Sequence, residues 1–304
     1  MMSMQATPAE ASTEIELWLG ADPVVRSVVS DPSLRTTQGP RPYLHPVRTA
    51  AGVVVTDSAP EDHPWHLGVS VALQDVAKTN FWGGRTFLRE GGPTWQADHG
   101  RIDRSRLLAA RPDLRRPEEI EEELHWRSPT GGLQLVERRR IAVRPADTSN
   151  AWVLDFAFTL TNATEAEIEL GSPATNGKAG GGYGGFFWRL PASTIAPTVF
   201  TAEASGENGV HESTADWLAV HGHGLHGAGY TLVFLAGDAR TAADPWFVRI
   251  ADYPGIGSSL AIDEPIRLAP ADTLARRLLI VVSDGHLDTD GAAQAAAAAV
   301  SRLG

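Results

Sequence analysis

Residues 133–162 read LQLVERRRIAVR-PADTSN-AWVLDFAFTLTN, two alternating segments separated by a turn that begins at Pro145. In the first segment every second residue from Leu133 to Val143 is apolar, with the exceptions of Glu137 and Arg139. A period of two is typical of β-strands, because successive side chains point to opposite faces of a sheet. The stretch therefore predicts two long strands joined in a meander.

The same pattern continues on both sides of this stretch. Further alternating segments lie at 101–109, 119–127, 231–236, 246–250 and 275–282, with turn residues between them. Short strands are expected at 43–47 and 53–56, on either side of Ala51-Gly52. Helix signal is confined to residues 290–302, where Asp290 can cap an alanine-rich segment. We expect an all-β fold, a large antiparallel β-sandwich with a short C-terminal helix. Residues 1–12 are expected to be a disordered lead-in, and residues 13–304 a single domain.

Composition excludes several classes of function. The 304 residues include no cysteine, which excludes disulfides, thiolate metal sites and cysteine nucleophiles. The net charge of −11 argues against nucleic acid and anionic membranes as partners. There is no secretory segment and no apolar run long enough to span a membrane, so a cytoplasmic location is expected.

Residues 61–68, EDHPWHLG, gather two acids, two histidines, a proline and a tryptophan. Pro64 fixes its φ angle and favours a turn, in which the i, i+3 spacing brings His63 and His66 to one face. Asp62 is placed to orient a histidine. Acid–base or hydrogen-bonding roles are favoured for these histidines over a metal site, and a third interpretation is that they only satisfy loop backbone.

Two interpretations of Glu137 stay open at this point. The carboxylate lies in phase with the apolar face of its strand, so it needs a partner if it is buried. It either pairs with Arg139 at the end of a sheet, or it lines a concave site as a catalytic group.

Residues 180–189, GGGYGGFFWR, lack the strand–GxGxxG–helix context of a nucleotide-binding loop. A close approach of the backbone to a ligand or to a neighbouring strand explains the glycines better. Tyr183, Trp188 and Arg189 then offer a hydrogen-bond donor, a stacking face and a cation.

The sequence in this order resembles the bacterial PmoA-like family. The resemblance rests on Asp62–Gly68, Glu137–Arg139, Gly181–Arg189 and residues 244–249, and it extends over residues 40 to 285. The family usually has histidine at the position of Trp65 and arginine at that of Leu67. A three-histidine metal cluster built on this motif is therefore less expected here. The strand pattern is also similar to the galactose-mutarotase-like supersandwich, which implies a sheet that binds sugars.

We therefore expect a carbohydrate-active enzyme that acts on a small-molecule sugar or glycoside by hydrolysis, elimination or epimerisation, without a metal or other cofactor. The expected catalytic residues are His63, His66 and Glu137. The expected substrate-binding residues are Asp62, Trp65, Trp82, Tyr183, Trp188 and Arg189. Two alternatives are a non-catalytic sugar-binding module and a metal-dependent enzyme that uses His63, His66 and one of His221, His223 or His226. A homo-oligomer is left open.

Overall fold

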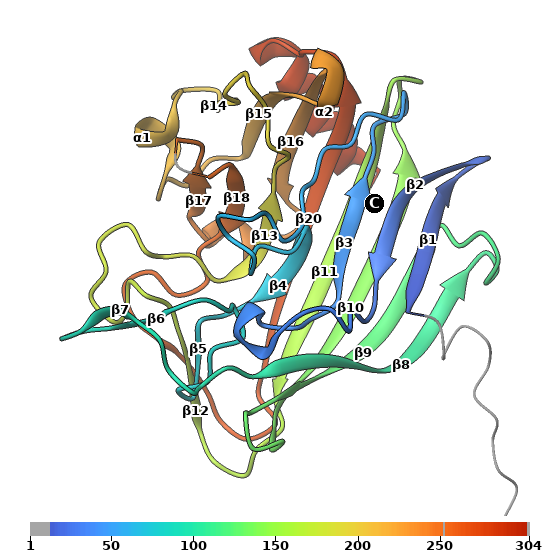
Figure 1. Cartoon of the computed structure of the whole chain (residues 1–304). Helices are drawn as coiled ribbons and strands as arrows, with labels where there is room; N and C mark the ends of the chain where they lie inside the picture. The colour runs from blue at the N-terminus through green and yellow to red at the C-terminus, as the bar shows by residue number, and fades with distance from the viewer. Residues whose placement is uncertain (1–12, 252, 303–304) are drawn as a thin grey trace, which may run out of the picture.

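Two large antiparallel sheets lie face to face in the computed structural model, which describes residues 13–251 and 253–302 (Figure 1). The expected lead-in, residues 1–12, lies outside the described residues. The seven-stranded sheet has the order β1 (Glu14–Leu19), β2 (Asp22–Val28), β3 (Tyr43–Val47), β4 (Val69–Ala72), β13 (Gly185–Arg189), β18 (Gly255–Ser258) and β17 (Trp246–Arg249).

The eight-stranded sheet contains the long strands of the meander. Its order is β14 (Thr198–Phe200), β15 (Trp217–His223), β16 (Gly229–Ala236), β20 (Thr273–Asp284), β11 (Ala151–Asn162), β10 (Leu133–Pro145), β9 (Glu119–Arg127) and β8 (Arg101–Arg111). The predicted pairing of residues 133–144 with 151–162 is confirmed, because Arg139 lies opposite Phe158 and Ile141 lies opposite Phe156.

Short elements complete the chain. A three-stranded sheet joins β19 (Ile266–Leu268), β12 (Ile168–Gly171) and β5 (Asp75–Val76), and a hairpin joins β6 (Thr86–Leu88) and β7 (Gly92–Thr94). The helices are α1 (Glu207–Val210) and α2 (Thr289–Ser301), with 3-10 turns at Thr36–Gln38, Leu225–Gly227 and Thr241–Ala243.

Alternation along each strand determines which side chains enter the main core. In β13, Phe186 and Trp188 point between the sheets, where they meet side chains such as Phe156 of β11 and Phe234 of β16. Phe187 points the other way and packs with Phe247 of β17 on the outer face of the seven-stranded sheet. The two faces of one strand thus serve two different clusters.

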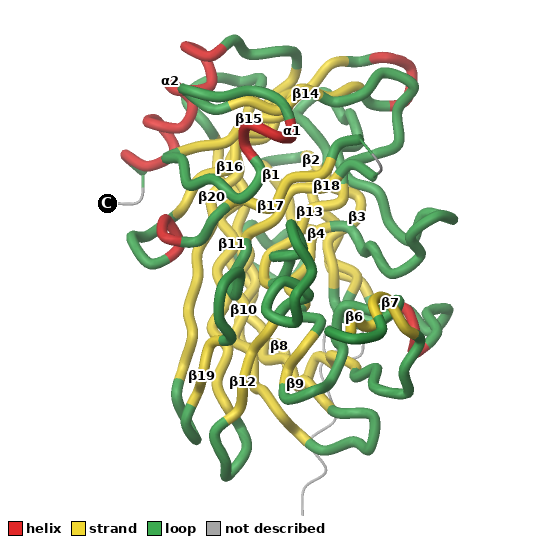
Figure 2. The backbone as a smooth tube through the Cα atoms, turned by 90° about the vertical axis from the view of Figure 1, so that its left-hand side faces the viewer, coloured by secondary structure: helices red, strands yellow, loops and turns green. Residues whose placement is uncertain are grey.

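Helix α2 covers part of the outer face of the eight-stranded sheet (Figure 2). Its buried residues Ala292, Ala296 and Ala299 are small enough to let the helix backbone approach the strands closely. The carboxylate of Asp288 caps the helix by accepting the N–H of Gly291 at 2.8 Å. The expected cap at Asp290 is therefore wrong by two residues, although Asp290 does lie in the first turn.

The expected fold class, an all-β antiparallel sandwich with a short C-terminal helix, is confirmed. One short strand expected at residues 53–56 is wrong, because only Val54 makes an isolated bridge there, to Arg48. In the described residues no helix is long and apolar enough to cross a membrane.

Candidate functional site

The candidate site lies on the outer face of the seven-stranded sheet. We call it the histidine site. Ring contacts join most of its members, and Arg189 lies close to the carboxylate of Asp62. The site consists of Asp62, His63, Trp65, His66, Trp82, Tyr183, Phe187, Arg189 and Tyr253. Phe187 and Arg189 come from β13, and the other residues come from loops that fold over this face. Seven of the nine expected site residues are thus brought together.

A tight turn arranges the two histidines as expected. The N–H of His66 donates to the carbonyl of His63 at 2.9 Å, which closes a turn around Pro64. The imidazole rings consequently stack, with their centroids 4.8 Å apart and their planes at 23°. Gly68 ends the motif with a φ of 42°, and a Cβ there would lie 2.1 Å from the carbonyl oxygen of Leu44. Only glycine allows the motif to enter β4 this closely.

Asp62 and His63 form a hydrogen-bonded pair at the rim of the site. Nδ1 of His63 lies 2.8 Å from a carboxylate oxygen of Asp62. Burial by itself raises the pKa of Asp62, but the hydrogen bond to His63 and the charge of Arg189 outweigh it and lower that pKa. An ionised Asp62 keeps the proton of His63 on Nδ1, which leaves the Nε2 lone pair of His63 free to accept a proton.

His66 lies deeper, against an aromatic floor. Only 2% of the residue is exposed, and its Nδ1 atom has no hydrogen-bond partner. The rings of Phe187, Trp82 and Tyr253 pack around it at centroid distances of 5.1, 5.9 and 4.8 Å. Burial, followed by the charges of His63, Arg189 and Arg41, lowers the pKa of His66 well below its usual value. His66 is therefore neutral at pH 7 and suited to hydrogen bonding.

Arg189 brings a buried guanidinium to the same place. Its side chain is 3% exposed, and its Nε and Nη1 atoms have no hydrogen-bond partner. Nη2 lies 4.0 Å from Asp62, and the guanidinium lies over the ring of Tyr253 at 5.9 Å. Burial lowers the pKa of Arg189, although Asp62 and Asp57 partly oppose this shift.

A second buried arginine, Arg41, holds the loops of the histidine site together by hydrogen bonds. Its guanidinium donates to the carbonyls of Gly39, Trp82 and Trp65 and to the hydroxyl of Ser70, so all of these loops are tied together. Burial and the charge of Arg139 lower the pKa of Arg41 to about 9, which leaves it charged at neutral pH.

Trp65 and Trp82 are both part of the histidine site, as expected. The ring of Trp65 lies on Gly84, where a Cβ would come within 2.7 Å of the indole. Trp82 is 3% exposed and packs between Tyr183 and Phe187 at 4.8 and 4.9 Å. Tyr183 is partly exposed, and its hydroxyl accepts a hydrogen bond from Gln74 at 3.2 Å. Burial raises its pKa.

Glu137 is not in the histidine site, and its expected catalytic role there is wrong. The residue is fully buried in the core face of β10, where both carboxylate oxygens accept hydrogen bonds from Arg139 at 2.6 and 3.1 Å. Trp126 donates its Nε1–H to the same carboxylate at 2.9 Å. The structural alternative, a Glu137–Arg139 pair, is the one that the structure contains, because an isolated charge in this core is too costly.

Trp188 is likewise outside the site, so its expected role in substrate binding is wrong. It is fully buried between the sheets, and its indole N–H donates to the carbonyl of Val55 at 2.8 Å. Its neighbour Arg189 points to the outer face, as alternation along β13 requires.

The histidines at 221, 223 and 226 do not join His63 and His66. His221 stacks on His286 at 4.6 Å and His223 contacts the same ring at 4.8 Å, on the eight-stranded sheet. A metal site that combines the two groups is therefore wrong. Within residues 13–251 and 253–302, no three His, Asp or Glu side chains are arranged to hold a metal ion.

Three residues of this region were missed from the sequence, Tyr253, Phe187 and Arg41. Tyr253 follows β17 in the chain and reaches both histidine rings, at 4.5 and 4.8 Å. An aromatic residue before Pro254-Gly255, in a turn between two strands, was a usable signal for a loop that carries function. Arg41 lies between two prolines, and nothing in the local pattern indicated its four acceptors.

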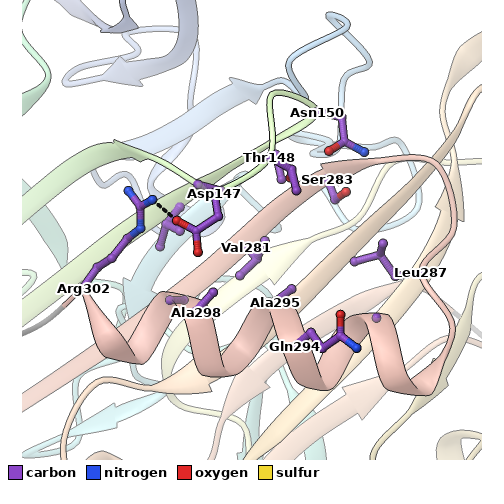
Figure 3. A pocket seen from close by; sticks show the side chains of 15 residues that line it. Asp147, Thr148, Asn150, Val281, Ser283, Leu287, Gln294, Ala295, Ala298 and Arg302 are labelled. Atoms are coloured by element: carbon purple, nitrogen blue, oxygen red, sulfur yellow. Dashed lines mark hydrogen bonds and ion pairs between the residues drawn. The ribbon is translucent and has the colours of Figure 1, made fainter.

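A separate pocket of about 380 Å³ lies between α2 and the outer face of the eight-stranded sheet (Figure 3). Asp147 and Arg302 form an ion pair at its edge, and Val281 and Leu287 belong to its apolar lining. None of the expected site residues lines this pocket, so it is distinct from the histidine site.

Comparison with protein families gives one match. The model of a family of unknown function, DUF6807, matches residues 14–297. No curated protein matches the chain. The resemblance to the PmoA-like family stays a prediction.

Comparison with solved structures gives distant similarities to sugar-related proteins. A putative aldose 1-epimerase from Escherichia coli K12 aligns over 90% of this chain and 99% of its own, with 11% identity and a TM-score of 0.41. The GH36 α-galactosidase AgaA from Geobacillus stearothermophilus aligns over 80% of this chain, with 12% identity and a TM-score of 0.37. This chain spans about a third of that galactosidase, 33% of its length. At these TM-scores the similarities carry no argument about chemistry.

Proposed function

The chain belongs to the DUF6807 family of unknown function, and we propose that it is an enzyme acting on a sugar or glycoside by acid–base chemistry at the histidine site. The observation that carries this proposal is the pair of Asp62 and His63, 2.8 Å apart, beside the buried guanidinium of Arg189. A carboxylate-oriented imidazole next to a buried cation is a frequent arrangement for proton abstraction.

In this proposal His63 is the base. Its Nε2 atom takes a proton from a sugar hydroxyl, or from a carbon next to a sugar carbonyl, and Asp62 stabilises the imidazolium that forms. The positive charge of Arg189 stabilises the negative charge that develops on the substrate. His66, which stays neutral, binds a hydroxyl.

The aromatic side chains supply the surface for a sugar ring. Trp65 and Tyr253 are partly exposed, while Trp82 and Phe187 form the buried floor beneath them. Flat apolar faces with a few polar groups between them are typical of small-molecule sites.

Elimination and epimerisation fit this set better than hydrolysis. The usual hydrolytic mechanism needs two carboxyl groups that flank the glycosidic bond. With Glu137 in the core, Asp62 is the only expected carboxylate that remains at the histidine site. A base that removes one proton needs only His63 and its partner.

The alternative of a non-catalytic sugar-binding module predicts aromatic residues without a carboxylate beside a histidine. The contact between Asp62 and His63 favours the enzyme over this module.

A turnover assay tests the proposal. Aldoses, glycosides and their 3-keto derivatives are incubated with the protein and with the variants His63→Gln and Asp62→Asn. We expect His63→Gln to lower kcat/KM by roughly 10²- to 10⁴-fold, because it removes the base. The control is His125→Gln, which changes a histidine that contacts Glu123 on the eight-stranded sheet. Full activity of His63→Gln would exclude this role, and binding without turnover would favour the module.

A further inference from the structure

The histidine site and its surroundings are rich in buried positive charge. Arg41 and Arg189 are each 3% exposed, and both act electrostatically on His66. Lys178 lies over the ring of Tyr183 at 5.4 Å and has no carboxylate partner among the described residues. Burial, and then the charge of Arg249, lowers the pKa of Lys178. These cations stand out in a chain whose net charge is −11.

The carboxylates that face Arg189 do not satisfy it. Asp62 is 54% exposed and lies 4.0 Å away, and it already accepts the hydrogen bond of His63. Asp57 acts on Arg189 only through its charge, and its own carboxylate is bonded to the N–H of Ser58. Nε and Nη1 of Arg189 are left without an acceptor, although a buried guanidinium N–H is costly to leave unpaired.

A second arginine on this sheet, Arg249, has hydrogen-bond acceptors for its guanidinium. Arg189 of β13 and Arg249 of β17 both lie opposite Gly255 of β18, so they share one row across the outer face. Arg249 donates to the carbonyls of Gly180 and Val248 at 2.6 and 2.7 Å, and Glu207 lies 3.8 Å away. The guanidinium of Arg249 thus has acceptors within the protein, whereas Nε and Nη1 of Arg189 have none.

We propose that Arg189 binds a carboxylate of the substrate, so that the ligand of the histidine site is a sugar acid rather than a neutral sugar. Nε and Nη1 lie on different edges of the Arg189 guanidinium, and each edge also includes Nη2. A carboxylate accepts two parallel hydrogen bonds from one such edge, as Glu137 does from Nε and Nη2 of Arg139, so a ligand carboxylate would give an acceptor to one of the two unpaired atoms. The inference rests on the proposed function for the sugar part of the ligand, whereas the carboxylate part rests on Arg189 alone.

Paired ligands test this substrate class. Glucuronate and glucose differ at C6 by a carboxylate in place of a hydroxymethyl group, and acetate offers the carboxylate alone. Their dissociation constants are measured by calorimetry at constant ionic strength. We expect glucuronate to bind about 10- to 100-fold more tightly than glucose, since a charge-assisted bidentate pair replaces unpaired N–H groups.

Variants assign this preference to one residue. Arg189→Gln is expected to remove the advantage of glucuronate over glucose, and Arg189→Lys to keep only part of it because the fork is lost. Arg249→Gln is the matched control, and it is expected to keep most of the advantage. Asp62→Asn is expected to tighten glucuronate binding, because a competing negative charge is removed.

The outcomes separate this inference from the proposed function. Equal binding of glucose and glucuronate, with no binding of acetate, would overturn the carboxylate inference and leave the sugar site intact. Binding of acetate that depends on Arg189, without binding of either sugar, would support the anion subsite and count against the sugar enzyme. If Arg189→Gln does not fold, Arg189→Lys and the salt dependence of the glucuronate advantage decide the question.

Discussion

Two neighbouring residues, Trp188 and Arg189, show how much one step along a strand changes. Both follow the glycine-rich segment, and both were expected to bind substrate. Trp188 is fully buried between the sheets, whereas Arg189 lies on the outer face beside His66. Because side chains alternate in β13, the two could not serve one site. The alternation of side chains along a strand would have excluded one of the two residues from the site on sequence grounds alone.

The lowered pKa of His66 leads to a prediction about how the stability of the protein depends on pH. Its lowered pKa means that the unfolded chain binds the proton at higher pH than the folded chain does, so stability falls as pH drops below about 6.5. The contribution of neutral His66 is full above that pH and is lost towards its lowered folded pKa. We expect His66→Phe to flatten this loss, as measured by urea unfolding between pH 5 and pH 8.

Partly buried histidines add to the pH dependence of stability in both proteins. Burial also lowers the pKa of His45 and His221, so the difference between wild type and His66→Phe isolates His66. Parallel stability curves for the two proteins would contradict the prediction.

Glu137 makes a prediction about the core. Glu137→Gln leaves the guanidinium of Arg139 buried beside a neutral amide, so we expect unfolding to become easier by about 3–5 kcal/mol. The double variant Glu137→Met with Arg139→Met removes both charges and is expected to recover much of this loss. Chemical denaturation measures both effects. A double variant as unstable as the single one would show that the pair itself contributes the stability.

At the scale of the element, the long strands were predictable and the short ones less so. β9, β10 and β11 follow the expected ranges because alternation over nine or more residues is a strong local signal. The expected strand at 53–56 is a short run of β-branched residues and makes only one bridge. Whether so short a segment becomes a strand depends on an adjacent partner, which local sequence does not specify.

The packing of helix α2 on the eight-stranded sheet through small side chains leads to a prediction about stability. Ala296 is buried against the eight-stranded sheet, while Ala297, one position along, is exposed. Ala296→Glu forces a carboxylate into this contact, and we expect a loss of about 1–3 kcal/mol together with faster amide exchange in α2. Ala297→Glu is the matched control, with little change expected in either quantity. Equal effects of the two substitutions would contradict the packing described.

At the scale of the whole molecule, one core joins the two large sheets. Side chains from β4 and β13 of one sheet meet those from β11, β16 and β20 of the other in a single apolar cluster. We therefore expect residues 13–304 to unfold in one cooperative transition, with equal calorimetric and van't Hoff enthalpies. Two separable transitions in calorimetry would contradict the expected single domain.

Local pattern determined most of the architecture of this protein. Alternation and turn residues are properties of neighbouring residues, so the sequence alone was enough to predict the β-sandwich and the turn that stacks His63 on His66. For the same reason Asp62, beside His63 in the chain, was correctly expected to orient it.

Only the tertiary structure decided which side of which sheet each polar group faces. Glu137 is in phase with an apolar face, and only the packing of the second sheet against that face makes it a core residue. Tyr253 reaches the histidines because β17 and β18 pair next to β13, far away in the sequence. Strand order and sheet packing arise from long-range contacts that no local pattern encodes, and these contacts isolate the donors of Arg189 beside His66.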